Sequence, residues 1–392
     1  MQFKDITGQI EIKRRLIQTV KENRVSHAQL FHGPEGSRKL AMAIAYAQFI
    51  NCRNRIIDPD SPGGGDACGT CPSCIKFSKL IHPDLHFIFP VATTKEVDKD
   101  PVSNDFLKTW RETLLENDFR LGLNDWYKVA GFEKKQGIIN ADDCSEILRT
   151  LSYKSYESEF KVMIIWMADR LYHSAAPKIL KILEEPPDKS LFILITENPE
   201  KIINTILSRT QTLRFPKLKD EDIMHELARP SLACSPEDAQ RIIPLADGNL
   251  TRAVKILQQD EDELFYLEKF VLWMRLCYKN ELKTTFDFVT EIGKLGREKQ
   301  KNFLAYTQRI IRNALLINYN NPHLTRLNKD EQEFLLKFGK FINHTNILRF
   351  NEELEKAQMQ IDRNANAGIL FMDMSMTFTI LLLTAEKALA RN

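Results

Sequence analysis

Two short apolar runs constrain the fold of this 392-residue chain more than any other feature. Residues 161–166 (KVMIIW) and 191–196 (LFILIT) lack the polar alternation of a half-exposed strand, so both faces of each strand are expected to be buried. Between them, residues 175–185 have helical character and end before Pro186, because a residue that precedes proline is pushed out of the helical region. Strand, helix and strand in this order predict a parallel α/β sheet covered on both faces.

The same alternation extends over the N-terminal half of the chain. Helices are expected at 9–23, 39–51, 141–151 and 202–207, and further strands at 28–32, 85–91 and 211–215, which makes five strands in all. Beyond Pro216 only helices are expected, three short ones over 220–257 and longer amphipathic ones from 261 onward. The predicted division is therefore an α/β domain (1–215), a small helical lid domain (216–260) and a helical C-terminal domain (261–392).

Two segments interrupt the α/β pattern. Residues 52–74 contain closely spaced cysteines and glycines, and residues 92–140 are polar and irregular except for a helix expected at 106–115. We expect the second segment to be an insertion on the surface. Trp166 and the aromatic residues of the C-terminal helices are expected to be core residues and not a platform for stacking bases.

The loop after the first strand has the position of a phosphate loop but not its full sequence. Gly33, Gly36 and Lys39 lie where the pattern G-x-x-x-x-G-K-[ST] would place a phosphate-binding turn. Arg38 replaces the second fixed glycine, and Leu40 replaces the hydroxyl residue that ligates magnesium. We interpret the loop as a degenerate structural turn, with nucleotide binding as the alternative, and we expect no ATP on this chain.

An active ATPase also needs carboxylates at the end of the strand over 161–166, where they hold magnesium and position water. Trp166 and Met167 stand at this place, and only Asp169 remains acidic nearby. Hydrolysis by this chain is therefore not expected.

Four of the seven cysteines cluster with a spacing suited to a metal. Cys52, Cys68, Cys71 and Cys74 follow the pattern C-x15-C-x2-C-x2-C, and four thiolates suit a tetrahedral structural zinc that is closed to water. An iron–sulfur cluster and unliganded thiols are the alternatives, although the Cys-Pro that usually follows in ferredoxins is missing.

The charge balance limits the kind of partner. Lys plus Arg number 55 and Asp plus Glu 53, so the chain lacks the strong positive charge of a protein that holds DNA by phosphate neutralisation alone. No apolar run long enough to cross a bilayer is expected, and the N-terminus shows no apolar targeting region. These features favour a cytoplasmic protein without membrane contact.

Three segments carry a resemblance to a known family: KILKILEEPP at 178–187, TENP at 196–199 and TILSR at 205–209. Their order and spacing resemble the clamp-loader subunits of bacterial DNA polymerase III, which are AAA+ proteins. The resemblance covers about residues 3–257 and implies an AAA+ core for 1–215 and a collar-type oligomerisation domain for 261–392. The degenerate loop implies a delta-prime-like subunit that does not hydrolyse ATP, and the family carries a zinc module at the place of residues 52–74.

In this family an arginine after a serine contacts the ATP of the neighbouring subunit. Arg209 matches that arginine, although Thr210 follows it where the family has cysteine. A local ion pair at the entrance of a strand is the alternative interpretation. Arg252 matches a lid arginine that senses nucleotide in active relatives, and here we expect a structural role.

The implied partners are the other loader subunits (tau/gamma and delta), the sliding clamp and, within the complex, primer–template DNA. Two other functions stay open at this point. One is an ATP-hydrolysing subunit similar to tau/gamma, and the other is a zinc-dependent DNA-binding adaptor.

Overall fold

The structure is a computed structural model that describes the chain except for residues 59–60, 62, 134, 153–155, 173–174, 259–260, 320–324, 326, 328 and 390–392. It contains two compact units. The first comprises Met1–Phe132, Gln136–Ala239 and Gly248–Val254, and the second comprises Glu133–Lys135, Gln240–Asp247 and Lys255–Asn392. The division into three domains, with boundaries near 215 and 260, stays a prediction.

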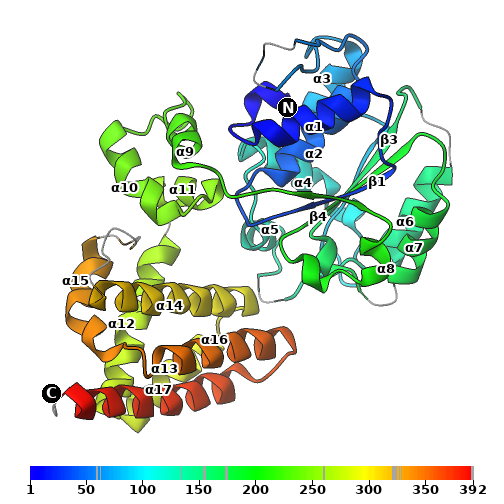
Figure 1. Cartoon of the computed structure of the whole chain (residues 1–392). Helices are drawn as coiled ribbons and strands as arrows, with labels where there is room; N and C mark the ends of the chain where they lie inside the picture. The colour runs from blue at the N-terminus through cyan, green and yellow to red at the C-terminus, as the bar shows by residue number, and fades with distance from the viewer. Residues whose placement is uncertain are drawn as a thin grey trace. The chain divides into compact units, whose positions relative to one another are not determined.

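The first unit is built on a parallel sheet of five strands (Figure 1). The spatial order is β2 (Leu85–Ile88), β3 (Lys161–Trp166), β4 (Ser190–Thr196), β1 (Ala28–His32) and β5 (Gln211–Arg214). All four pairings are parallel, and one row across the sheet joins Ile88, Ile165, Leu194, Leu30 and Thr212. The predicted parallel α/β sheet is confirmed.

Helices cover both faces of this sheet because β3 and β4 carry apolar side chains on both sides. One buried cluster joins Phe31, Leu191 and Ile193 to α1 (Ile10–Lys21), α2 (Lys39–Ile50) and α3 (Pro72–Ser78). The other joins Phe192 and Leu194 to α6 (Ala141–Ser152), α7 (Ala176–Glu184) and α8 (Asn204–Leu207). The candidate site, described below, lies at the carboxyl ends of the strands, where the loop after β1 and residue Glu197 after β4 are found.

The insertion over 92–140 is not a surface elaboration, and that expectation is wrong. It forms α4 (Leu107–Glu116), which was expected, and α5 (Leu123–Val129), which was not. Trp110 and Trp126 from these helices are fully buried, with ring centroids 5.0 Å apart, and Trp110 lies 5.1 Å from Trp166 and 4.2 Å from Phe89. The insertion therefore completes the core beside the end of β3.

Three short helices follow the sheet, as predicted: α9 (Asp220–Leu227), α10 (Pro236–Ala246) and α11 (Leu250–Leu257). The remaining helices, again as predicted, make a helical C-terminal region with its own core around Phe270, Trp273, Phe303 and Phe371. They are α12 (Glu261–Lys279), α13 (Leu282–Gly293), α14 (Arg297–Asn318), α15 (Lys329–Phe338), α16 (Ile347–Asp362) and α17 (Ala367–Leu389).

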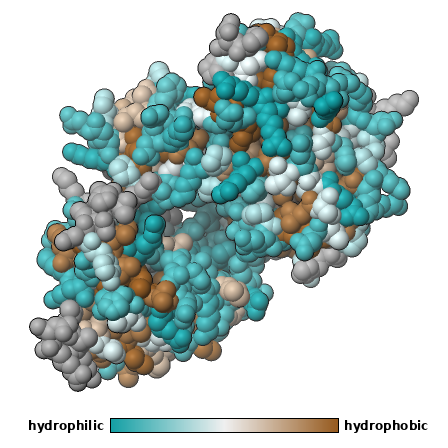
Figure 2. Space-filling view, in the orientation of Figure 1, coloured by the Kyte–Doolittle hydropathy of each residue, from teal (hydrophilic) through white to brown (hydrophobic). Residues whose placement is uncertain are grey.

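One helix in the described part of the chain is long and apolar enough to pass a length-and-composition test for a membrane span, which corrects the expectation that no such run exists. It covers Ala367–Ala385 within α17, and 33% of it is buried inside the protein. Its Phe371, Phe378 and Leu382 pack into the core of the second unit, and a core helix passes the same test. Figure 2 shows hydrophobic side chains scattered over a mostly hydrophilic visible surface.

Candidate functional site

The loop between β1 and α2 has the connectivity of a phosphate loop, but its own residues occupy its polar groups. The Lys39 ammonium donates hydrogen bonds to the carbonyl oxygens of Gly33 at 2.7 Å and Pro34 at 2.6 Å. Lys39 is buried, and burial lowers its pKa while the nearby carboxylates of Glu197 and Glu35 oppose that shift. The charge that would meet a phosphate in an active loop is thus satisfied within the loop itself.

Arg38 takes the place of the second fixed glycine and keeps its left-handed backbone, with φ of +67°. A side chain with a Cβ adopts this conformation only at a cost of about 1–2 kcal/mol, so the native contacts must compensate for it. The guanidinium is buried: Nη1 donates to the carbonyl oxygen of Asp118 at 2.8 Å, and Nη2 lies 3.4 Å from Asp118 Oδ2. The loop after α4 therefore lies directly against the phosphate loop.

The end of β3 is apolar, as predicted. Trp166 and Met167 are each 3% exposed and belong to the same buried cluster as Trp110. Asp169, the carboxylate that remains, accepts a hydrogen bond from Thr196 Oγ1 at 2.6 Å. This strand end consequently offers neither of the two carboxylates that would hold magnesium and position water.

Glu197, directly after β4, belongs to the TENP segment, but the sequence analysis did not place it at this site. It is partly buried, and burial together with the nearby Glu35 raises its pKa to about 7, against the opposing effect of Lys39. A carboxyl group with a pKa of about 7 is about half ionised at neutral pH, and its ionised form would repel a bound triphosphate.

A network of buried charges links the phosphate loop to α9, and the sequence did not reveal it either. The Glu226 side chain has no solvent exposure and lies 3.4 Å from Arg120 Nη1 and 3.1 Å from Arg229 Nη1. Thr7 donates a hydrogen bond to the same carboxylate. Arg120 also lies 3.1 Å from Asp118, the partner of Arg38.

Arg209 follows α8 and precedes β5, and its side chain is 35% exposed. Its Nη2 lies 2.6 Å from Glu184 Oε1 at the end of α7, and its Nη1 donates to the Thr205 carbonyl oxygen at 2.9 Å. The local ion pair that the sequence allowed is therefore present, and the guanidinium is still accessible. Arg252 lies in α11, where its backbone N–H donates to Asn249 Oδ1 at 2.9 Å.

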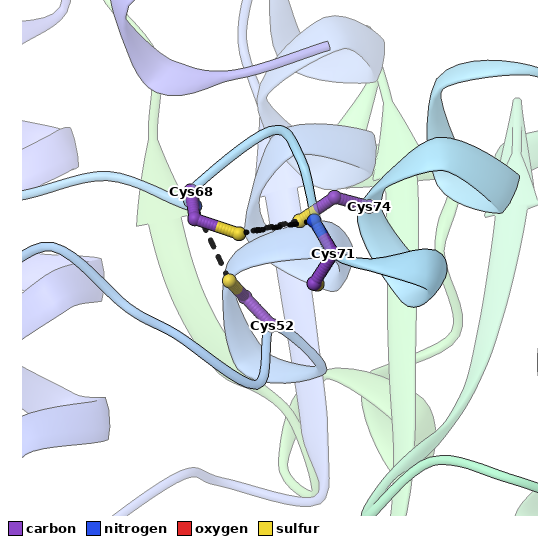
Figure 3. A group of neighbouring side chains, drawn as sticks. All are labelled: Cys52, Cys68, Cys71 and Cys74. Carbon is purple, nitrogen blue, oxygen red and sulfur yellow. Dashed lines mark hydrogen bonds between the residues drawn. The ribbon is translucent and has the colours of Figure 1, made fainter.

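The four clustered cysteines come together, as their spacing predicts (Figure 3). Cys52 follows α2, Cys68 lies in the following loop, Cys71 directly precedes α3, and Cys74 lies in the first turn of α3. Their sulfur atoms all lie within 4.8 Å of one another, with 3.9 Å between those of Cys68 and Cys74. Four sulfurs bound tetrahedrally at about 2.3 Å from zinc would be about 3.8 Å apart, so the donor set fits this ion.

Backbone N–H groups support the sulfurs. The N–H of Cys68 donates to Cys52 Sγ at 3.2 Å, and that of Cys71 donates to Cys68 Sγ at 3.4 Å. Burial raises the pKa of Cys52 and of Cys74; for Cys68 the effect of burial is outweighed by backbone hydrogen bonds from Thr70 and Cys71, which lower its pKa to about 6. Such donors orient metal-binding thiolates and stabilise their charge.

The profile described as "DNA polymerase III, delta subunit" matches residues 8–219, more than half of the chain. The chain belongs to this family. This member of the DNA polymerase III delta subunit family is 29% identical to the DNA polymerase III subunit delta' of Bacillus subtilis (strain 168). The alignment spans 253 residues, which are 64% of this chain and 60% of that protein. The predicted resemblance to delta-prime is confirmed.

A second relative of this family member is the DNA polymerase III subunit tau of Bacillus subtilis (strain 168), 24% identical over 261 residues, covering 66% of this chain and 37% of that protein. The matches thus span 60% or less of the length of these two relatives. Among solved structures, a DNA polymerase III gamma subunit-related protein from Thermotoga maritima aligns with a TM-score of 0.39 and 14% identity over 96% of this chain and all of that one. That superposition adds nothing to the assignment.

Proposed function

We propose that this chain is a delta-prime-like subunit of a DNA polymerase III clamp loader that does not hydrolyse ATP. It would assemble in the cytoplasm with ATP-hydrolysing tau/gamma subunits and with delta, and the complex would load the sliding clamp onto primer–template DNA. The observation that carries the proposal is the filled phosphate loop: Lys39 binds carbonyl oxygens of its own loop, and Arg38 holds Asp118 across it. Membership of the DNA polymerase III delta subunit family supports the proposal that the complex is a DNA polymerase III clamp loader.

The absence of hydrolysis follows from what phosphoryl transfer requires. Bound phosphates need free backbone donors and a lysine, and magnesium needs a hydroxyl and carboxylates. Here the lysine is engaged, Leu40 has no hydroxyl, and Trp166 and Met167 are buried in an aromatic core. Restoring one of these groups alone would leave the others missing.

The proposed contribution of this subunit to catalysis is Arg209. A guanidinium placed against the charge that develops on a transferring phosphoryl group can raise the rate by about 10³–10⁵-fold. In the isolated chain Arg209 is paired with Glu184, whose side chain is 49% exposed. Such half-exposed pairs are worth about 0–1 kcal/mol, so exchanging Glu184 for a phosphate of a neighbouring subunit would cost little.

The four cysteines are proposed to hold one structural zinc ion. Zinc bound by Cys52, Cys68, Cys71 and Cys74 would fasten the end of α2 to the start of α3, because the ligands come from both elements. The adjoining loop already anchors the N-terminus: Asp66 accepts hydrogen bonds from the backbone N–H of Phe3 at 3.0 Å and of Lys4 at 2.9 Å. The remaining parts of the proposal are a lid domain over 216–260 and an oligomerisation domain over 261–392.

The test combines calorimetry with reconstitution. The isolated chain should bind magnesium-ATP weakly or not at all, and adding it to purified loader ATPase subunits and delta should increase turnover of ATP stimulated by clamp and DNA. Micromolar magnesium-ATP binding with turnover by the chain alone would instead indicate a tau/gamma-like ATPase. Salt-sensitive DNA binding by the isolated chain, without any effect on loader turnover, would indicate a DNA-binding adaptor.

A further inference from the structure

The segment between α4 and α5, residues 117–122, lies between the phosphate loop and α9; we call it the α4–α5 loop. Asp118 binds Arg38 of the phosphate loop through its carbonyl oxygen at 2.8 Å and through its carboxylate at 3.4 Å. Arg120 binds Glu226 of α9 at 3.4 Å. One short loop thus joins the phosphate loop to α9 through Arg38 and Glu226, two residues that are 188 positions apart in the sequence.

The α4–α5 loop is itself firmly held. Phe119 and Leu121 are 7% and 8% exposed and belong to the main core cluster of the first unit. Asp118 and Phe119 have left-handed backbones, with φ of +48° and +59°, a conformation that tertiary contacts must enforce in residues with a Cβ. The loop is therefore packed in place between its two ionic contacts.

A second contact runs from the phosphate loop to α11. Asn249 caps the start of α11 and donates to Glu35 Oε2 at 3.2 Å. Gly122, the first residue before α5, is so close to the Glu35 carboxylate that a Cβ at this position would collide with it. Gly36, with φ of +71°, is similarly close to the Asn249 side chain, and a Cβ at Gly36 would collide with it. Glycine at this position therefore allows the contact between the phosphate loop and Asn249.

We propose that the α4–α5 loop is a built-in strut, which ties the phosphate loop to α9 permanently and, through Gly122 beside Glu35, supports the phosphate loop's own contact with α11. The strut closes the phosphate loop to nucleotide. The proposal rests on the non-hydrolysing function inferred above and deepens it. A ligand that bridges two elements fixes them only while it is bound, whereas partners on the same folded chain are always present at their site. In this subunit α9 and the first turn of α11 are held in one arrangement with the phosphate loop at any ATP concentration.

The strut explains three features together. It gives a structural purpose to the insertion over 92–140, a reason for arginine at the second glycine position, and a reason for a fully buried carboxylate on α9. Arg38 at φ of +67° and Glu226 at zero exposure each cost free energy unless their partners are present. Arg38 has its partner Asp118 in this loop, and Glu226 has Arg120 in this loop in addition to Arg229 and Thr7.

Hydrogen–deuterium exchange of the full-length chain tests the strut. In Arg120→Met, which keeps the aliphatic stem and removes the charge, backbone amides of α9 should exchange at least tenfold faster, while those of β3 and β4 change less than twofold. Arg14→Met is the matched control, because Arg14 belongs to an exposed pair with Glu11 in the same unit and should leave α9 unchanged. Saturating magnesium-ATP should not alter α9 exchange in the wild-type chain.

A second variant keeps the test decisive if Arg120→Met does not fold. Gly122→Ala has an ordinary backbone, and its Cβ would displace only the ends of the Glu35 and Asp125 side chains, so it should fold. Exchange in the first turn of α11 should become about threefold faster or more, because Glu35 is the residue that contacts α11. The strut is refuted if folded variants leave α9 and α11 at wild-type exchange, or if ATP protects α9 in the wild type. Failure of the loader role would appear elsewhere, in reconstituted turnover, with these exchange rates unaffected.

Discussion

Glu226 is a fully buried carboxylate in contact with two guanidinium groups, so replacing it by alanine gives a sharp prediction. Its carboxylate has no exposed surface and lies 3.1 Å from Arg229, 3.4 Å from Arg120 and in hydrogen-bond contact with Thr7. Glu226→Ala leaves two guanidinium groups in a buried region that already holds Arg38. The Asp118 carboxylate, beside Arg120 and Arg38, then compensates the repulsion among these three like charges only in part.

The magnitude follows from burial. Removing one partner of a buried ion pair typically costs about 3–5 kcal/mol, because the remaining charge stays desolvated. Arg120 and Arg229 are 10% and 26% exposed, so water can reach them in part, and we take the lower end, about 3 kcal/mol. Glu226→Gln should cost less, since an amide oxygen still accepts a hydrogen bond from Thr7.

Urea unfolding followed by tryptophan fluorescence measures this cost, because Trp110, Trp126 and Trp166 are buried in the first unit. For Glu226→Ala a loss of about 3 kcal/mol would lower the urea midpoint by about 1 M or more. Glu11→Ala is the control: that carboxylate is 87% exposed in its pair with Arg14, and its loss should change little. A midpoint for Glu226→Ala indistinguishable from that of the control would refute the reasoning.

Three further outcomes are expected. The pKa of Glu197 in the folded chain, about 7, lies above the unfolded value of about 4.3, so the free energy of unfolding should fall as pH rises through that window. Glu197→Gln should show a smaller fall and be more stable than the wild type at pH 8, and parallel stability profiles of the two proteins against pH would contradict this. Cys71→Ser should release about one zinc per chain by elemental analysis while the sheet stays folded, whereas iron in the wild type would contradict a zinc site. Trp110→Ala should lower stability by about 3–5 kcal/mol, and a loss below about 1 kcal/mol would show that the insertion is not part of the core.

The sheet could be predicted from the sequence because its signal is local. The apolar runs of β3 and β4, the helix between them and the proline that ends it lie within about 35 residues. The four cysteines were equally readable, since thiolate spacing is itself the pattern of the ligand set. The broken phosphate loop and the apolar end of β3 were recognised residue by residue.

The strut could not be predicted because its contacts are distant in sequence and irregular in backbone. Arg120 and Glu226 are 106 residues apart, and Asp118 and Phe119 adopt left-handed conformations that no periodicity indicates. Nothing in the sequence distinguishes Glu226 from the other acidic residues of α9. The two tryptophans of an otherwise polar segment, Trp110 and Trp126, were the available hint that residues 92–140 are packed against the core.

Replacing Arg209 in a reconstituted loader tests the central claim most directly. Arg209→Ala should fold and assemble, because the contacts of Arg209 with Glu184 and Thr205 are partly exposed to solvent. At the adjoining site it should lower the ATP turnover stimulated by clamp and DNA by at least tenfold, while the other sites stay active. Arg209→Lys should rescue poorly, because an ammonium cannot reproduce the planar guanidinium, and Arg14→Ala should behave as wild type. Complexes that carry Arg209→Ala and load clamps at the wild-type rate would contradict the account.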